Sequence, residues 1–294
     1  MKFEDLSKKL QKKILKLQRS ELTAYYIYKK LAKRVKSDHN KKVIEQIAKE
    51  ELTGYHTWKS ITKLDLKPSK FTMKFYIFLN VILGLTFSIK LLEINERRGE
   101  SRLNYNEIQK FYPEEIALLN RPNPHEERLI ALIDEKRLEL MGSVTLGLND
   151  ALVELTGTLA GFTLALQDNE IIALIGLIMG FAASLSMGAS EYLSNKTEGA
   201  EKPLQAAYYT SFAYVFVVIF LIFPFFLFSD PFISIGVTVL VALLIIFLFT
   251  FYVSVVKDFN FRQRFIQMAV ISLGVATVSF GIGYLVKLSL GFDI

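Results

Sequence analysis

The sequence predicts an all-α protein with a helical bundle over residues 1–140 and a five-helix transmembrane domain over residues 141–294. The chain has 294 residues, 51% of them hydrophobic, and a mean hydropathy of +0.31. Residues 1–140 hold 29 of the 35 Lys and Arg and 19 of the 29 Asp and Glu, whereas residues 141–294 hold 6 and 10. The second part therefore has too few charges to cover itself with polar surface, which excludes an ordinary soluble enzyme. The absence of cysteine excludes disulfides, thiolate metal sites and cysteine nucleophiles.

The second part contains five apolar stretches, each long enough for the roughly 20 residues that cross a hydrocarbon core. They cover residues 141–166, 171–194, 205–228, 232–256 and 265–290. Two of the intervening loops carry no Lys or Arg. The other two carry Lys196, Lys202, Lys257, Arg262 and Arg264. Because basic loops stay in the cytosol, we expect a cytosolic N-terminus and an outer C-terminus. With no organelle-targeting segment visible, a prokaryotic plasma membrane is the simplest expectation.

A sixth apolar stretch covers residues 71–92 and includes Lys74 and Lys90. A span here would place residues 1–70 and 93–140 on opposite sides of the membrane. We therefore predict an amphipathic helix that lies on the membrane or against the bundle, with its lysines extended toward water.

Ionisable side chains inside the expected spans are the strongest functional signal. Asp150 and Glu154 are four residues apart and share one helix face, and Met187 and Glu191 repeat that spacing in the second span. A carboxylate at membrane depth costs on the order of 2.5–3.5 kcal/mol, so such residues usually face a bundle interior or an aqueous path. Carboxylate and thioether together suit a borderline divalent cation. The alternatives are a hydrogen-bonding role for Asp150 beside Asn149, and Met187 as core filler.

Glycines crowd the same two spans. Gly157 and Gly161, like Gly176 and Gly180, have the spacing that lets two helices approach closely. The pattern predicts a closely packed helix pair or a dimer interface.

The segments GSVTLGLNDALVELTGTLAG (142–161) and GLIMGFAASLSMGASEYLS (176–194) resemble the first two helices of the vacuolar iron transporter (VIT) family. The resemblance extends over all five spans. It implies a homodimer that exports Fe²⁺, and often Mn²⁺, from the cytosol, commonly in exchange for protons. By motif position, Asp150 and Met187 correspond to the family's membrane metal site, with Glu154 and Glu191 as partners. The connection at 195–204 is too short for the cytosolic metal-binding domain of the plant-type transporters, so another part must gather the metal.

The first part is expected to form four helices, with Asp38 as an N-cap. They cover residues 3–36, 38–64, 71 to about 105, and 125–140. Four helices with one long crossover are the layout of ferritin-like bundles, where carboxylates from facing helices bind two irons. The candidate iron ligands are Glu21, Glu51, Glu93, Glu96 and His125.

This part resembles a rubrerythrin-type ferritin-like domain, and its fusion to a VIT-like domain resembles the membrane-bound ferritins of prokaryotes. Two positions depart from the family's Glu-x-x-His pattern, because Gly54 stands where His belongs and Pro122 where Glu belongs. Three interpretations stay open: a reduced site that captures Fe²⁺ for the pore, an unusual oxidase, or a relic bundle with solvated charges.

The expected function is export of Fe²⁺, and of Mn²⁺, by proton antiport, with the bundle capturing iron. The expected partners are metal ions, the lipid bilayer and a second copy of the chain, without nucleic acid. The alternative is a membrane-tethered di-iron oxidase or peroxide scavenger whose spans serve as an anchor. A receptor or scaffold is disfavoured, because a mere anchor need not keep Asp150 and Glu154.

Overall fold

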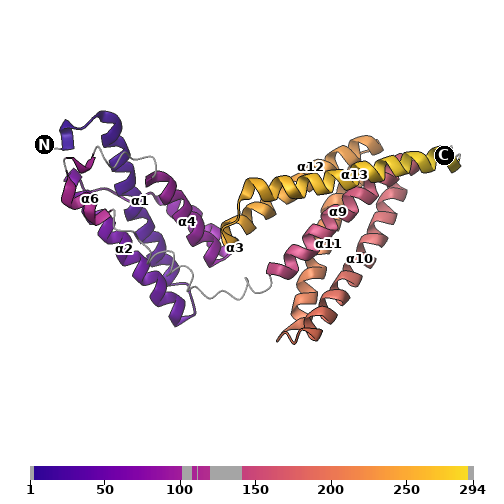
Figure 1. Cartoon of the computed structure of the whole chain (residues 1–294), viewed down its shortest axis with the longest axis horizontal. Helices are drawn as coiled ribbons and strands as arrows, with labels where there is room; N and C mark the ends of the chain where they lie inside the picture. The colour runs from indigo at the N-terminus through magenta and orange to yellow at the C-terminus, as the bar shows by residue number, and fades with distance from the viewer. Residues whose placement is uncertain (1–2, 101–107, 111, 120–140, 291–294) are drawn as a thin grey trace. The chain divides into compact units, whose positions relative to one another are not determined.

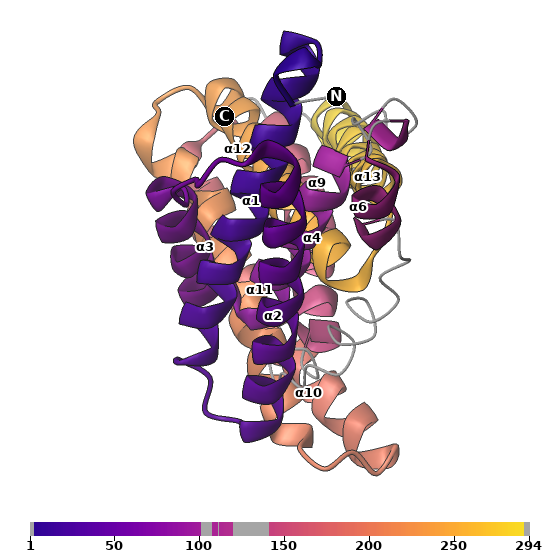
Figure 2. The ribbon, with the colours of Figure 1, turned by 90° about the vertical axis from the view of Figure 1, so that its left-hand side faces the viewer.

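The computed structural model describes residues 3–100, 108–110, 112–119 and 141–290, and every element in these ranges is helical (Figures 1 and 2). The chain divides into two compact units, Met1–Glu135 (unit 1) and Lys136–Ile294 (unit 2). The prediction of an all-α protein is confirmed for the described residues.

Unit 1 begins with the short 3₁₀ helix η1 (Phe3–Asp5) and continues with α1 (Lys8–Ala32) and α2 (Asp38–Thr62), which pack along each other. Figure 2 shows these two helices side by side. The predicted cap at Asp38 is wrong by one residue. The side chain of Ser37 accepts the hydrogen bond from the Asn40 amide, and Asp38 is the first helical residue.

The expected single helix over residues 71–92 is also wrong. The stretch is divided into α3 (Lys70–Leu83) and α4 (Leu85–Glu100) by Gly84, whose φ of +92° favours glycine. With 14 residues, α3 is about 21 Å long, which is less than the roughly 30 Å of a hydrocarbon core. A further short helix, α6 (Pro113–Leu119), packs on α2. The expected fourth helix at 125–140 lies outside the described residues.

Two hydrophobic clusters hold unit 1 together. One joins α1 and α2 to buried residues of α3 and α4, including Met73, Tyr76 and Ile89. The other surrounds Trp58, the one tryptophan of the chain, between α2 and the first half of α1. Both halves of α1 are thus buried against neighbours, which is why apolar side chains recur along it at helical spacing.

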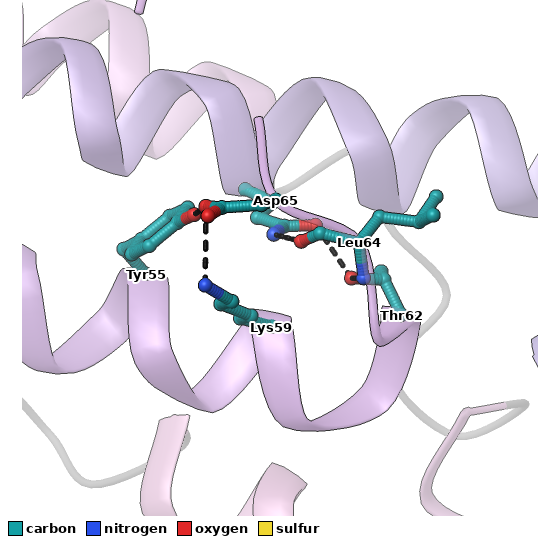
Figure 3. A network of polar contacts seen from close by, with 6 residues as sticks. Tyr55, Lys59, Thr62, Leu64 and Asp65 are labelled. Carbon is teal, nitrogen blue, oxygen red and sulfur yellow. Dashed lines mark hydrogen bonds and ion pairs between the residues drawn. The ribbon is translucent and has the colours of Figure 1, made fainter. Parts of the chain in front are cut away.

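A polar network fixes the end of α2 (Figure 3). The Tyr55 hydroxyl donates to Asp65 Oδ1 at 2.5 Å, and Lys59 Nζ lies 3.1 Å from the same oxygen. The hydrogen bond from Tyr55, together with Lys59, lowers the pKa of the Asp65 carboxyl below its usual range. Burial, together with the bond to Asp65, raises the pKa of Tyr55.

The buried Gln18 of α1 completes this network. Its amide nitrogen donates to the Leu64 carbonyl at 2.8 Å, and its amide oxygen accepts from the Thr62 hydroxyl at 2.7 Å. The connection from α2 to α3 is therefore attached to α1 by side-chain hydrogen bonds.

Unit 2 consists, in the described residues, of five long helices. They are α9 (Met141–Leu166), α10 (Asn169–Thr197), α11 (Pro203–Leu227), α12 (Pro231–Lys257) and α13 (Phe261–Leu290). Four of them, α10 to α13, are long and apolar enough to cross a membrane. Unit 2 is therefore an integral membrane unit.

The remaining helix, α9, lies at the centre of unit 2. It contacts all four other helices and lies between the α10–α11 and α12–α13 pairs (Figure 1). Its 26 residues measure about 39 Å, which is enough to cross a membrane, although Asn149, Asp150 and Glu154 interrupt its apolar run. The prediction of five spans is thus supported for four helices, and the crossing by α9 stays a prediction.

Hydrogen bonds show which loops of unit 2 share an end. The Asn169 side chain, beside the α9–α10 loop, donates to the Phe228 carbonyl at 2.6 Å and to Ser234 Oγ at 3.2 Å. The two loops without Lys or Arg therefore lie together.

The opposite end holds the beginning of α9. Ser143 donates to Glu191 near the end of α10 at 2.7 Å, and Thr210 near the start of α11 donates to the Ser143 carbonyl at 3.1 Å. The α13 helix runs parallel to α9, because Ser272 donates to the Leu152 carbonyl and Gly283 faces Gly161 about two to three turns further on. The loops with Lys and Arg therefore belong to the end at which α9 starts.

Candidate metal path in the membrane unit

Two carboxylates and a tyrosine meet between α9 and α11. Asp150 and Glu154 are half-buried, one turn apart on α9, and their negative charges interact. The hydroxyl of Tyr214, a buried residue of α11, donates to Glu154 Oε2 at 2.7 Å. Both carboxylates act electrostatically on Tyr214. The structure thus brings Asp150 and Glu154 into one polar cluster, which can present anionic oxygens to a cation.

Tyr214 was not among the residues expected from the sequence. It lies within the run AYVFVVIF, and a phenol at mid-helix depth needs a hydrogen-bond partner when it is buried. That requirement was the signal that could have identified it.

Close packing of α9 against α11 brings Glu154 and Tyr214 together. A side chain at Gly147 would collide with the Thr210 carbonyl oxygen, so α9 and α11 touch at backbone distance there. Two turns further along α9, Glu154 comes within reach of Tyr214. The small residue at position 147 is therefore a condition for the hydrogen bond between the two helices.

The glycine pairs expected to bring helices together make contacts within one chain. Gly157 and Gly161 face Ser279 of α13, and Gly176 and Gly180 face Ile222 and Val218 of α11. These contacts confirm the predicted close packing of helices, for α9 with α13 and for α10 with α11.

The two candidates on α10 are placed differently. Met187 is half-buried against the core of unit 2, to which α9 contributes Ala151, the neighbour of Asp150. Glu191 accepts the hydrogen bond from Ser143, seven residues before Asp150 on α9. Glu191 thus lies nearer than Asp150 to the end with the basic loops.

The described residues contain no group of three or more His, Cys, Asp or Glu side chains placed to hold a metal ion. The Asp150–Glu154 pair supplies two carboxylate groups as metal ligands, and the Tyr214 hydroxyl next to Glu154 supplies a neutral oxygen. A cation bound at the pair would therefore need further ligands, of which the Met187 thioether is the chemically suited candidate from α10.

The candidate carboxylates of unit 1 that the structure describes are buried or half-buried. The Glu21 carboxylate lies directly against Gly54, so any side chain at position 54 would displace it. Glu21 thus fills the space that a histidine at position 54, which the expected Glu-x-x-His pattern would require, would have to enter.

The other candidates of unit 1 lie on α2 and α4. Glu51 is buried at 7% exposure, and Glu93 is buried at 6% with an ion pair to Arg97 at 3.0 Å. Glu96 is half-buried three residues after Glu93. His125 lies outside the described residues.

Comparison with known proteins gives one result for unit 2. The sequence model of the VIT family matches residues 141–202, which include α9, α10 and the four transmembrane residues expected from the sequence, but not Tyr214. No curated protein and no solved structure matches the chain. The matched segment is similar to the VIT family, and this similarity indicates membrane transport of iron or manganese.

Proposed function

We propose that the chain exports divalent iron or manganese from the cytosol and that the Asp150–Glu154 pair is the ion-binding point of its path. The observation that carries the proposal is the position of this pair. It lies on α9, which contacts the four other long helices of unit 2. The hydroxyl of Tyr214, on α11, donates a hydrogen bond to Glu154. A purely structural helix at the centre of such a unit would gain more from apolar side chains, because buried charges are costly.

The remaining transmembrane candidates line the route to that point. Glu191 lies at the end with the basic loops, which the charge pattern assigns to the cytosol. An ion entering there meets Glu191 first, and Met187 lies on the same helix one turn closer to the cluster. Exchange with protons is chemically suited to such ligands, because a carboxylate that binds a metal must give up its proton.

The test is flux through the full chain in proteoliposomes. Asp150→Asn keeps the size of the side chain and removes its charge, so we expect loss of Fe²⁺ and Mn²⁺ flux. The matched control is Asp258→Asn, the same change at an exposed loop residue with a left-handed backbone that Asn also adopts. Unimpaired flux in the folded Asp150→Asn protein contradicts the proposed site.

Proton coupling has its own measurement. A pH-sensitive dye inside the vesicles should report a pH change opposite in sense to metal movement. Metal flux that leaves the internal pH unchanged contradicts antiport while leaving the metal path in place.

Unit 1 is proposed to capture the metal. The supporting observation is that Glu51 and Glu93 place two carboxylates, ligands suited to a divalent metal ion, in the interior of unit 1. We expect the full-length double variant Glu51→Gln/Glu93→Gln to bind less Fe²⁺ per chain than the parent protein.

The second candidate, a membrane-tethered oxidase, is separated from transport by the Asp150→Asn variant. If unit 1 oxidises Fe²⁺ independently of transport, this full-length variant oxidises iron in air at the rate of the parent protein. The transport proposal expects the variant to lose flux whatever its oxidation rate.

A further inference from the structure

The α3 helix presents its most apolar side chains outward. The outward stripe of α3 consists of Phe71, Phe75, Phe78, Val81 and Ile82, with exposed fractions between 45% and 82%. In the described part of unit 1, the one other large apolar residue that is this exposed is Leu64, which lies just before α3. Such a concentration on one short helix marks an interaction surface.

The opposite face of α3 is already occupied. Met73 and Tyr76 are buried in the core formed with α1 and α4, and the Tyr76 hydroxyl accepts from the Asn95 side chain at 2.7 Å. The helix is therefore held to the bundle by one face and offers the other to a partner. Because Gly84 ends the helix and α4 returns to the core, the stripe is confined to α3.

Charge identifies the partner. The exposed residues Lys63, Lys67, Lys70 and Lys74 lie beside and within the first turns of α3, and that helix carries no acidic residue. An amphipathic helix with Phe on one side and Lys around it is the composition that lies in a membrane interface. Its lysines are attracted to anionic headgroups.

We propose that α3 lies in the surface of an anionic bilayer, with the outward stripe of α3 inserted between headgroups and acyl chains. Unit 2 of the same chain is an integral membrane unit, so a bilayer is present wherever the protein is. The helix is too short to span and well suited to lie in the plane. It would thereby fix the orientation of unit 1 relative to the lipid surface, independently of any transport.

The absence of cysteine makes a direct test simple. The full chain with Phe78→Cys carries a single polarity-sensitive fluorophore and is reconstituted into phosphatidylcholine vesicles with or without phosphatidylglycerol. We expect a blue-shifted emission that brominated acyl chains quench, more strongly with phosphatidylglycerol. The matched control is Lys49→Cys, an exposed position of α2, whose label should stay in water and escape quenching.

Each other result contradicts the proposal. A Phe78→Cys label shielded from both water and brominated lipid means that protein, a second copy or another part of the chain, covers the stripe. A label in water means that nothing covers it. Equal quenching with and without phosphatidylglycerol contradicts the role of the lysines.

The lysines are tested separately on the same labelled chain. The variant Lys67→Gln/Lys70→Gln/Lys74→Gln should lose the extra quenching caused by phosphatidylglycerol. Retained quenching overturns the charge argument, and unchanged Trp58 emission checks that the bundle is folded.

Discussion

At the scale of single residues, the hydrogen bond from Tyr214 to Glu154 has the most specific role. It joins α9 to α11 at 2.7 Å, between the buried Tyr214 and the half-buried Glu154. A bond to a charged group contributes about 1.5–3 kcal/mol, and losing the donor leaves the carboxylate under-solvated. The same hydroxyl also restricts the rotation of the Glu154 carboxylate.

We therefore expect Tyr214→Phe to lower both the thermal unfolding temperature and the rate of Fe²⁺ flux in proteoliposomes. The control is Tyr208→Phe on the same helix, since that ring is 65% exposed. Equal behaviour of the two variants would show that the hydroxyl of Tyr214 is dispensable.

A pH effect is expected in unit 1, where the pKa of Asp65 is lowered by Tyr55 and Lys59. A carboxyl whose pKa is lower in the folded state stabilises that state above its unfolded value of about 3.9. The contribution is lost as the pH falls through the folded-state value. The melting temperature reported by Trp58 fluorescence should therefore be lower for Asp65→Asn than for the parent chain at neutral pH.

This difference should shrink as the pH falls from about 4 through the lowered folded-state pKa of Asp65, because below that value both chains carry a neutral group at position 65. A difference that stays constant with pH would assign the effect to packing rather than to charge.

At the scale of helices, the contact of Gly147 with the Thr210 carbonyl sets the spacing of α9 and α11. Gly147→Ala should separate them, at a cost of about 1–3 kcal/mol for overpacking, and weaken the bond between Glu154 and Tyr214. Gly142→Ala is the control on the same helix, since nothing lies near its added methyl group. Melting temperature and metal flux should fall for the first variant alone.

The sequence predicts helices better than their interruptions. The bounds of α9 to α13 follow from long apolar runs closed by Asp, Pro or Lys residues, which act locally. Gly84 within an apolar run could not be distinguished from a tolerated helical glycine, because its φ depends on how α4 packs. Ser37 and Asp38 are both good capping residues, and which of them caps the helix depends on the residue at which the backbone becomes helical.

The candidate site was likewise predictable only where its residues are close together in the sequence. The spacing of Asp150 and Glu154 is local, so their shared face could be read from periodicity. Tyr214 is 60 residues further on, and the contact of Glu21 with Gly54 joins two helices. Such pairs depend on which helices become neighbours in the fold. The periodicity of apolar residues along one helix gives no information about its neighbours.

At the scale of the whole molecule, the question is on which side of the membrane each loop lies. Single cysteines in this cysteine-free chain answer it with a membrane-impermeant thiol reagent on intact cells. We expect Ser229→Cys to be labelled, and Glu198→Cys and Lys49→Cys to be protected until the cells are lysed.

The last comparison also tests the crossing by α9. If α9 spans the membrane, Lys49 and Glu198 lie on the same side. Labelling of only one of the two positions in intact cells would show that α9 does not cross.

The central place of α9 also has a consequence for biosynthesis. During translation α9 is made before its neighbours, and Asn149, Asp150 and Glu154 interrupt the apolar run in its first half. Its packing partner α13 starts only at Phe261. If α9 crosses the membrane, the insertion machinery therefore receives this segment before its partner α13 has been synthesised.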